Sequence, residues 1–458
     1  MLLGFSVRNY KSFCATQSIS FVASKIKRHN AHVVSISNRR LLKSGLIFGA
    51  NAGGKTNLIK AVNLSKNIVL FGLGKANFSK AYFRIKKECY IQPGVFEYRI
   101  LVNDQEYSYG FAIAYAKREV ISEWLFRVMP SGKEFCIFSR DVHDGKANSV
   151  ETDINFNDVQ EADRLKIYFE DFGVNISEDL RKKMMLSDIA TRSGGKKGVF
   201  KEIYSVYEWF KRLLIIFPNS KYGLLNDLGR DVERKESFQK LMNYFDTGIE
   251  SVESQSKSID FDKILTEMPR DQAEKLKVDL YSQNDNSGIP LIVGRQMIVL
   301  RKDEMGNLVY NKLLFDHGNP DDKFDYGDES DGTKRLFDLV PLLFDEGKDY
   351  VIFIDEIDRS LHTKLTRKFI ELFFKKTIGE RCQLIATTHD SNLLDLDLVR
   401  QDEIWFVERE ADHGSIIFSL NRFKARFDKK VDKEYMLGRY GAIPIFYEEI
   451  LEENGDEE

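Results

Sequence analysis

Residues 49–56 read Gly-Ala-Asn-Ala-Gly-Gly-Lys-Thr, and they directly follow the apolar run Leu46-Ile47-Phe48. The run is typical of a buried parallel strand, and the residues after the stretch have the apolar spacing of an amphipathic helix. A glycine-rich turn between a strand and a helix directs successive backbone N–H groups at an anion. The stretch therefore predicts a phosphate-binding loop in an α/β fold, and it makes nucleotide binding the first function to test.

The side chains of this loop have tasks that follow from phosphate chemistry. Lys55 is expected to neutralise the β- and γ-phosphates, and the hydroxyl of Thr56 is expected to contact Mg²⁺. The backbone around these two residues surrounds the phosphates. The residues expected to bind the nucleotide are Gly49, Asn51, Ala52, Gly53, Gly54, Lys55, Thr56 and Asn57.

Two carboxylates end a second apolar run, Tyr350-Val-Ile-Phe-Ile354, far from the loop in sequence. A central parallel strand delivers residues such as Asp355 and Glu356 to its C-terminal edge, where ligands bind. There Asp355 is expected to hold Mg²⁺ through water, and Glu356 is expected to polarise the attacking water. A strand with a solvated end is the alternative for an isolated motif, but the phosphate-binding loop makes that alternative much less favoured.

A third apolar run, Leu384–Thr388, ends in His389. An isolated histidine is more often a packed core or surface residue than a catalytic one. Here the chain order is strand, Asp-Glu, helix, strand and histidine, which places His389 on the edge next to Asp355. His389 is therefore expected to reach the γ-phosphate.

A fourth motif, Glu329-Ser-Asp-Gly-Thr-Lys-Arg335, precedes apolar residues at helical spacing. Ser330 and its neighbours are ordinary residues for the start of a helix, because a serine hydroxyl accepts a hydrogen bond from the first turn. Taken alone, the motif predicts only a helix N-terminus.

Along the chain the four motifs follow the order phosphate-binding loop, Ser-x-Gly, Asp-Glu and histidine. In this order they resemble the ATP-binding-cassette (ABC) ATPases of the SMC, RecF and OLD type, over about residues 1–125 and 293–445. The resemblance implies an α/β ATPase head that binds ATP and Mg²⁺, with Glu356 and His389 as its catalytic residues. It also implies that a signature of one protomer caps the γ-phosphate held by the other, so that ATP joins two heads. Carried over by position, the signature is Ser330, Gly332 and Thr333, and the loop that contacts the partner head contains Asp358, Leu361 and His362.

Two positions depart from the pattern of this family. The signature reads Ser330-Asp-Gly-Thr333, whereas transporter-type cassettes have two consecutive glycines there, so the backbone is expected to differ. Gln92, before Pro93, is either the residue of the glutamine loop or a turn residue, and the turn is favoured.

The two ends of the chain carry a narrower resemblance. The opening Phe5-Ser-Val-Arg-Asn-Tyr-Lys-Ser-Phe13 and the closing Gly438-Arg-Tyr-Gly-Ala-Ile-Pro444 are similar to bacterial AAA-annotated, OLD-like ATPases. Such proteins occur in phage-defence and abortive-infection systems, for example as the ATPase of PARIS or Septu. The resemblance implies a sensor or scaffold that controls a separately encoded effector, often a nuclease, through ATP-dependent oligomerisation. The implied trigger is DNA or a phage protein.

Composition agrees with a cytoplasmic location. The chain has no run of about 18 uncharged apolar residues, and its first residues lead into a charged strand and not into a signal peptide. The four cysteines are scattered without paired spacing, which argues against a zinc site or a disulfide framework and favours buried small side chains.

Charge gives no overall attraction to nucleic acid. With 68 basic and 71 acidic residues the net charge is −3, so any contact with DNA has to be local. Charge runs of this length are usually solvated faces. The candidate basic patches are Lys25–Arg28, Arg181–Lys183, Lys196–Lys197 and Arg422–Lys430.

Changes in hydrophobic period divide the chain into four predicted segments. Two halves of the ATPase head enclose an inserted helical lobe, and a solubilising acidic tail follows. Prolines and glycines interrupt the helical lobe, which excludes the long coiled coil of SMC proteins. The segments are 1–155 (loop and β-lobe), 156–288 (helical lobe), 289–447 (signature, carboxylate pair and histidine) and 448–458 (tail).

Within these segments, strand alternation between residues 96 and 139 predicts an antiparallel meander. Aromatic residues at helical spacing predict a helix over Phe200–Phe217 that stops before a proline. Further helices are expected near 238–245 and 264–280, and strands resume at Leu291.

Three classes of function remain open. The favoured one is a defence ATPase that senses infection and regulates an effector. The second is a DNA-repair or recombination ATPase of the RecF kind that acts directly on DNA. The third is an enzyme with its own nuclease centre, but the acidic residues near Asp395 are better explained by a helix and turn after His389. A transporter is the least favoured, because no membrane segment or substrate domain is apparent.

Overall fold

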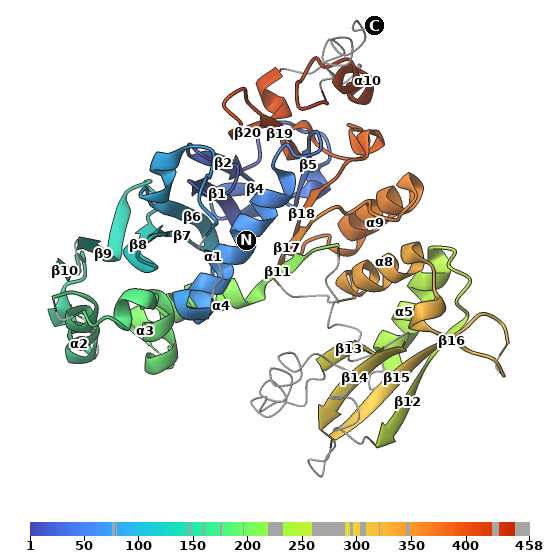
Figure 1. Ribbon diagram of the computed structural model, residues 1–458, viewed down its shortest axis with the longest axis horizontal. Coiled ribbons are helices and arrows are strands. Elements are labelled where there is room, and N and C mark those ends of the chain that lie inside the picture. The colour runs from blue at the N-terminus through green and yellow to red at the C-terminus, as the bar shows by residue number, and fades with distance from the viewer. Residues whose placement is uncertain are drawn as a thin grey trace, which may run out of the picture. The chain divides into compact units, whose positions relative to one another are not determined.

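The computed structural model separates the chain into two compact units (Figure 1). The first comprises Met1–Ile215, Lys348–Ile357 and Thr377–Glu458, and the second comprises Ile216–Gly347 and Asp358–Lys376. The structure describes residues 1–75, 78, 80–143, 146–147, 149–158, 161–174, 176–195, 197–218, 232–258, 289–293, 296–302, 308–319, 321–344, 349–423 and 430–444.

The central sheet of the first unit is mostly parallel. In sheet order its strands are β11 (Leu213–Ile216), β17 (Val351–Ile354), β18 (Gln383–Thr387), β5 (Ser44–Phe48), β19 (Ile404–Arg409) and β20 (Ser415–Ser419). Strand β5 pairs in parallel with β18 and β19, and β17 pairs in parallel with β18. Every residue of β5, β17 and β18 is buried, which explains why these strands are continuous apolar runs. The three buried strands predicted from sequence are confirmed.

A seven-stranded antiparallel sheet forms the β-lobe of the same unit. In sheet order its strands are β10 (Lys146–Ala147), β9 (Glu134–His143), β8 (Glu119–Val128), β7 (Gln105–Ala114), β6 (Gly94–Val102), β1 (Leu2–Arg8) and β2 (Gln17–Ser20). Strands β6 to β9 pair with their neighbours in the chain, so the predicted meander is confirmed. A separate hairpin is formed by β3 (Val33–Ile36) and β4 (Arg39–Leu42).

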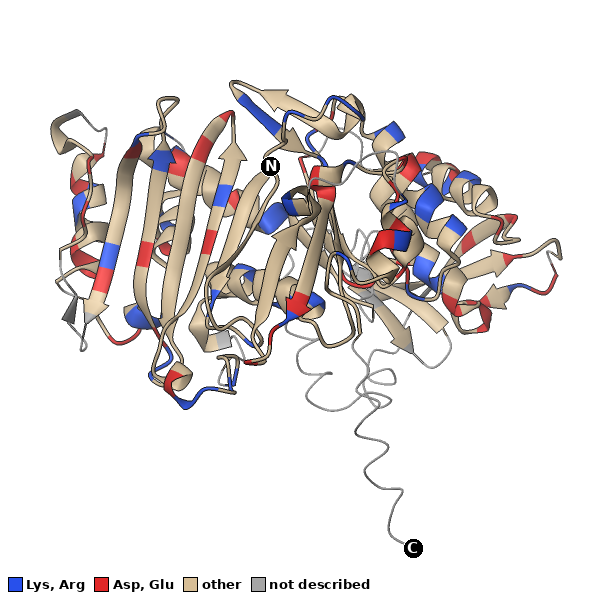
Figure 2. Ribbon diagram, turned by 90° about the horizontal axis from the view of Figure 1, so that it is seen from above, with Lys and Arg blue, Asp and Glu red and all other residues tan. Residues whose placement is uncertain are grey.

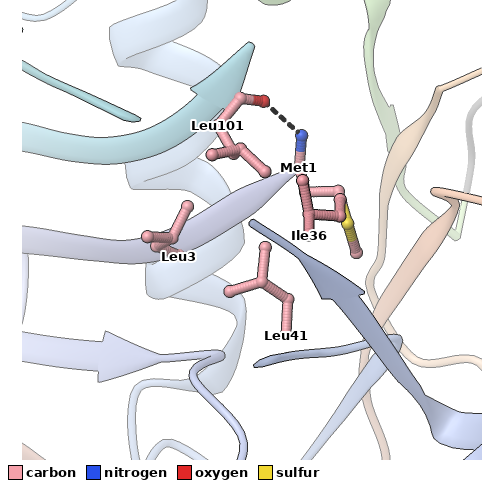
Figure 3. Packing of buried hydrophobic residues seen from close by; sticks show 5 residues of the cluster. All are labelled: Met1, Leu3, Ile36, Leu41 and Leu101. Carbon is pink, nitrogen blue, oxygen red and sulfur yellow. Dashed lines mark hydrogen bonds between the residues drawn. The ribbon is translucent and has the colours of Figure 1, made fainter. Parts of the chain in front are cut away.

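A small apolar cluster joins β1 to this hairpin and to β6. Met1, Leu3, Ile36, Leu41 and Leu101 are buried and pack together (Figure 3). The amino group of Met1 donates a hydrogen bond to the carbonyl of Leu101 at 2.8 Å. Burial lowers the pKa of this amino group to about 5, because the charged form loses its hydration.

Helix α4 (Gly198–Arg212) packs its aromatic residues on α1 (Lys55–Phe71) and on the β-lobe. The ring centroids of Phe210 and Trp209 lie 5.0 and 5.9 Å from that of Tyr98 on β6. Phe210 also lies 5.4 Å from Tyr109 on β7. Edge contacts of this kind stabilise a core by about 0.5–1.5 kcal/mol each beyond their buried area. These aromatic residues of α4 are therefore part of the core.

The helix predicted over Phe200–Phe217 is wrong at its end. The helix stops at Arg212, and Leu213–Ile216 forms the edge strand β11 of the central sheet. A short apolar run suits a helix or a strand equally well in its spacing. Here the edge of β17 supplies the hydrogen bonds of a strand, and the two isoleucines suit a half-buried pleated surface.

Two further helices, α2 (Ala162–Phe172) and α3 (Met185–Ser193), are anchored to the β-lobe by a buried ion pair. The Glu123 carboxylate on β8 accepts hydrogen bonds from Arg140 at 2.9 Å and from the backbone N–H groups of Met185 and Leu186 at 2.7 and 2.9 Å. The Arg140 guanidinium lies 4.9 Å from the ring centroid of Phe172. Glu123 thus caps the N-terminus of α3, where the helix dipole favours a negative charge.

The second unit has its own antiparallel sheet. In sheet order its strands are β12 (Ser251–Ser258), β15 (Leu308–Asp316), β14 (Gln296–Lys302) and β13 (Ile289–Val293), and β16 (Phe324–Asp325) pairs with β15. The unit also contains the helices α5 (Val232–Tyr244), α8 (Asp331–Leu339) and α9 (Thr363–Lys376). In its core the rings of Phe315, Phe238 and Tyr326 surround Phe337 at centroid distances of 4.6, 5.8 and 5.8 Å.

The helix predicted near 238–245 and the strands predicted from Leu291 onward are confirmed as α5 and β13 to β15. These strands form a separate sheet and do not extend the parallel one, and Ser251–Ser258, inside the predicted helical lobe, is a strand. It pairs with β15 along its whole length, a contact between distant residues that local period cannot reveal. The helix predicted near 264–280 and the acidic tail lie outside the described residues. The division into four segments stays a prediction.

Among the described residues, no helix combines the length and the apolar character that crossing a membrane requires.

Replacing Glu123 with alanine should lower the free energy of unfolding by about 3–5 kcal/mol, because Arg140 would keep a buried charge without its carboxylate. Urea denaturation followed by tryptophan fluorescence measures the change. Lys182→Ala is the control, because the ion pair of Lys182 with Glu178 is exposed and its loss should cost less than about 0.5 kcal/mol. Equal effects of the two substitutions would show that the buried pair does not hold these helices.

Candidate nucleotide-binding site

The loop between β5 and α1 requires glycine, because its backbone bends sharply and packs closely. Gly49, Ala52 and Gly54 have φ angles of 152°, 62° and 119°, which favour glycine. A Cβ atom on Gly49 would lie 2.2 Å from the carbonyl oxygen of Val407 on β19, and one on Gly53 would lie 2.9 Å from the same atom. Strand β19 therefore supports the loop from the end of the sheet.

Two serines that sequence reasoning missed also support this loop. The hydroxyl of Ser415 on β20 donates a hydrogen bond to the carbonyl of Gly53 at 2.6 Å, and its backbone N–H donates to the carbonyl of Ser12 at 2.7 Å. The hydroxyl of Ser12 accepts a hydrogen bond from Asn57 at 2.9 Å. No local pattern points to Ser415, whereas Ser12 lies in the opening stretch that carries the family resemblance. Together the serines connect the loop to β20 and to the segment after β1.

Lys55 is the first residue of α1 and lies against the loop. Its Nζ atom donates hydrogen bonds to the carbonyls of Gly49 and Ala50 at 2.6 and 3.1 Å, and it lies 3.3 Å from Nδ1 of His389. Lys55 is only 4% exposed. Its positive charge is thus held where the N-terminus of α1 already favours an anion.

The carboxylate of Asp355, directly after β17, joins three segments. Its Oδ1 atom accepts hydrogen bonds from Thr56 at 3.2 Å and from Thr387 on β18 at 2.7 Å. The hydroxyl of Thr387 also accepts a hydrogen bond from the backbone N–H of Glu356 at 2.8 Å. Thr387 is fully buried, and sequence reasoning gave it no role although it lies in the run that ends in His389. One threonine therefore orients both carboxylate residues.

Glu356 and His389 lie close together at this edge. Nε2 of His389 is 3.8 Å from Oε1 of Glu356. The ammonium of Lys55 can only donate, so its contact with Nδ1 suits the His389 tautomer that carries the ring proton on Nε2. Glu356 has a φ angle of 49°, a left-handed conformation that costs a non-glycine residue about 1–2 kcal/mol. Backbone strain of this kind gathers at functional sites.

The oxygen atoms at this edge fit Mg²⁺. Magnesium prefers hard oxygen ligands and is usually bound by one or two carboxylates together with phosphates and water. The Asp355 carboxylate and the Thr56 hydroxyl lie within 3.2 Å of each other and supply two such oxygens. The pair therefore suits a metal ion that arrives with a phosphate ligand.

The predicted signature lies in the second unit and starts α8. The hydroxyl of Ser330 accepts a hydrogen bond from the backbone N–H of Thr333 at 3.1 Å, so Ser330 is the N-cap residue. A Cβ atom on Gly332 would lie 2.9 Å from the carbonyl oxygen of Ser360, so a close backbone contact requires glycine here. The helix-start interpretation is confirmed, and the contact of this motif with a second protomer stays a prediction.

Several other residues predicted for the site lie outside the cluster at the edge of the sheet. Asn51 and Ala52 are exposed on the loop, and the side chain of Asn57 bonds to Ser12. The carbonyl of Gln92 accepts a hydrogen bond from Asn9 at 2.8 Å, and its side chain is exposed, which suits a turn residue. The predicted residues that the structure brings together are Lys55, Thr56, Asp355, Glu356 and His389.

Comparison with known proteins gives one family match. Residues 201–395 match the family described as "AAA domain, putative AbiEii toxin, Type IV TA system". The match includes the signature, the carboxylate pair and His389, but it excludes the loop at 49–56 and spans less than half of the chain. No curated protein matches the chain.

The chain is similar to two solved structures at low sequence identity. The SMC head domain from Thermotoga maritima is 13% identical with a TM-score of 0.37, and 91% of this chain and 98% of that chain are covered. The SMC head bound to the C-winged helix domain of ScpA is 14% identical with a TM-score of 0.36, and 92% and 99% are covered. The sheet order and the loop geometry define the class: this is a mixed α/β protein with a P-loop, and the predicted fold class is confirmed.

Replacing Thr387 with valine should lower the rate of phosphate release from ATP by about 10-fold to about 100-fold, the usual effect of losing a group that orients a metal ligand. Valine keeps the volume of threonine but cannot hydrogen-bond Asp355 or the N–H of Glu356. Steady-state phosphate release at saturating ATP measures the effect, and circular dichroism checks the fold. Thr387→Ser is the matched control and should keep most of the rate. An unchanged rate in Thr387→Val would contradict the orienting role.

Proposed function

We propose that the protein binds and hydrolyses ATP with Mg²⁺ as an ABC-type ATPase. The observation that carries the proposal is the convergence of the loop lysine and threonine, the carboxylate pair and the histidine at one edge of the parallel sheet. These residues come from three distant parts of the chain. Phosphate binding, metal binding and orientation of water are the tasks that ATP hydrolysis requires.

The proposed roles of these residues agree with their geometry. Lys55 and the N-terminus of α1 bind the β- and γ-phosphates, and Thr56 and Asp355 hold Mg²⁺. Bound MgATP supplies the γ-phosphoryl group, which transfers to an in-line water. Glu356 orients that water and accepts its proton. His389 donates a hydrogen bond to a γ-phosphate oxygen through Nε2.

We also propose that ATP joins two copies of the protein. In the family that the motifs resemble, the Ser-x-Gly signature of one protomer completes the site of the other. Ser330, Gly332 and Thr333 lie at the N-terminus of α8, where backbone N–H groups favour an anion. An assembly of this kind excludes bulk water from the γ-phosphate, so hydrolysis depends on dimerisation.

The proposed biological role is a sensor or scaffold subunit of a cytoplasmic anti-phage defence system. The description of the family that matches residues 201–395 names a toxin and a type IV TA system, which supports a role in such systems. The resemblance of both chain ends to defence ATPases supports it as well. ATP-dependent oligomerisation would control a separately encoded effector, a nuclease, after DNA or a phage protein provides the trigger.

The distribution of charge supports a protein effector more than direct action on DNA. Figure 2 shows basic and acidic residues interspersed along strands and helices. In two of the candidate basic patches, Arg28 pairs with Asp397 and Arg181 pairs with Glu119. Most of the patch at Arg422–Lys430 lies outside the described residues. A RecF-like or SMC-like repair ATPase that acts directly on DNA therefore has less support.

Lys55→Ala and Glu356→Gln should separate binding from hydrolysis. Lys55→Ala should weaken ATP binding by about 100-fold, because a buried charge-assisted contact contributes up to about 3 kcal/mol. Glu356→Gln should keep the affinity and lower hydrolysis by about 100-fold to about 10,000-fold, because an amide cannot accept the proton of water. Titration calorimetry and phosphate release measure the two effects. Equal loss of ATP binding in both variants would refute these roles.

The same Glu356→Gln protein should accumulate as a dimer with MgATP, which light scattering after size-exclusion chromatography detects. The Glu356→Gln protein is compared with the double variant that also carries Ser330→Asp. Aspartate is as good an N-cap residue as serine, so α8 should stay folded. Its negative charge would repel the γ-phosphate of the partner, so the dimer should be lost. Monomers at every ATP concentration in Glu356→Gln alone would contradict the dimer.

Native mass spectrometry tests the wider role. The Glu356→Gln protein is co-expressed with its genomic neighbours and measured with and without MgATP. An ATP-dependent assembly that contains a second gene product is expected. A homodimer that lacks such a product and retains DNA would instead favour the repair ATPase.

A further inference from the structure

Two thiols lie side by side in the first unit. Sγ of Cys14 is 3.9 Å from Sγ of Cys89, although the residues are 75 positions apart. All four cysteines are among the described residues, and none forms a disulfide. The sequence has no paired spacing of cysteines, so the proximity of these two thiols arises only from the fold. A disulfide has an S–S distance of about 2.0 Å, so its formation would draw the two sulfur atoms together by about 2 Å.

Asn9 holds the two segments that carry these thiols. Its backbone N–H donates a hydrogen bond to the carbonyl of Cys14 at 3.2 Å, and its Nδ2 donates to the carbonyl of Cys89 at 2.7 Å. Its Oδ1 accepts a hydrogen bond from the N–H of Phe83 at 3.0 Å. Asn9 is fully buried, so water does not compete for these bonds. The hydrogen bonds of Asn9 with the backbone therefore hold the two thiols close together.

Cys14 is connected to the phosphate-binding loop through Ser12, two residues earlier. The carbonyl of Ser12 accepts a hydrogen bond from Ser415, and its hydroxyl accepts one from Asn57 in the first turn of α1. Ser415 in turn donates to the carbonyl of Gly53 in the loop. A shift of the backbone at Cys14 therefore reaches both the loop and the start of α1.

Cys89 is connected to Ser415 through an ion pair. Nζ of Lys86, three residues before Cys89, lies 2.8 Å from Oδ2 of Asp412. Oδ1 of Asp412 accepts a hydrogen bond at 2.9 Å from the N–H of Gly414, which precedes Ser415. The N–H of Cys89 donates to the carbonyl of Lys86 at 3.2 Å. The segments of both thiols are thus connected to Ser415, which forms a hydrogen bond with the loop.

The two thiols differ in their access to solvent. Cys14 is partly exposed, whereas Cys89 is buried. Burial raises the pKa of Cys89 to about 11, and the hydrogen bond with Cys14 adds to the shift. Cys14 is therefore the sulfur that meets an oxidant first, and Cys89 is the resolving thiol.

We propose that Cys14 and Cys89 form an oxidisable dithiol whose disulfide loosens the support of the phosphate-binding loop. Cys14 first releases its thiol proton. Its thiolate attacks one oxygen of hydrogen peroxide, the O–O bond breaks, and a sulfenic acid and hydroxide form, after which the hydroxide takes up the released proton as water. Cys89 then attacks the sulfenic sulfur, and the sulfenic oxygen leaves as water with the Cys89 proton. Two thiols and one peroxide give one disulfide and two waters, and two electrons pass from sulfur to oxygen.

The effect on nucleotide binding rests on the proposed ATP site. Disulfide formation pulls on the segments of Ser12 and Lys86, and their hydrogen bonds and ion pair converge on Ser415. Strain at Ser415 weakens its bond to Gly53 and leaves the loop less ordered for phosphates. Oxidation therefore lowers nucleotide affinity, and by linkage bound nucleotide disfavours the disulfide by the same factor.

Peptide mapping by mass spectrometry tests the dithiol in the full-length protein. The protein is treated with hydrogen peroxide, and the remaining thiols are alkylated before digestion. One cross-linked pair of peptides that contains Cys14 and Cys89 is expected, and dithiothreitol should reverse it. Cys136 and Cys382 are internal controls that should join no cross-link. Alkylation of both Cys14 and Cys89 after treatment, or their oxidation without a cross-link, would overturn the proposal.

Titration with a fluorescent ATP analogue tests the coupling. Oxidation should weaken affinity by about 5-fold to about 150-fold, the usual range for coupled sites, and dithiothreitol should restore it. Cys89→Ser and Cys89→Ala should bind like the reduced protein and ignore peroxide, whereas Cys136→Ser should respond to it. Equal affinity of the reduced and cross-linked proteins would overturn the coupling. Failure of the reduced protein to bind the analogue would refute the ATP site, while the peptide map would still decide the dithiol.

Discussion

The hydrogen bonds of Asp355 are the contact on which the candidate site depends. Its carboxylate accepts hydrogen bonds from Thr56 on α1 and from Thr387 on β18, and Thr56 is 299 positions away in the chain. Parallel pairing of β17, β18 and β5 makes the contact possible, because parallel strands bring their carboxyl ends to one edge. Closing such distant contacts costs chain entropy, and the burial of three continuous apolar strands offsets that cost.

The loop depends on a second constraint, its close packing on the hairpin of β19 and β20. The carbonyl of Val407 leaves no room for a side chain at Gly49, and Ser415 bonds directly to Gly53. The loop is therefore shaped by strands from the far end of the chain as much as by its own glycines. Ser415 also receives the connections from both thiols, so the support of the loop and the proposed redox chemistry share one network.

Local pattern predicted the central strands well, because strands buried on both faces are apolar without interruption and can be recognised without knowing their partners. Local pattern failed for segments whose secondary structure depends on the strand with which they pair. Leu213–Ile216 continues the spacing of a helix, yet the edge of β17 makes it a strand. Ser251–Ser258 is polar and has no apolar run, and only its pairing with β15 makes it a strand.

The sequence by itself determined the phosphate-binding loop, the carboxylate pair, the histidine and the apolar strands before them, because each of these features is a run of neighbouring residues whose chemistry is local. Only the tertiary structure decided that Thr387 orients both carboxylate residues, that Ser12 and Ser415 support the loop, and that Cys14 meets Cys89. These are contacts of single polar or sulfur-containing side chains without periodicity. Their partners are set by the order of strands in the sheets, which distant segments establish together.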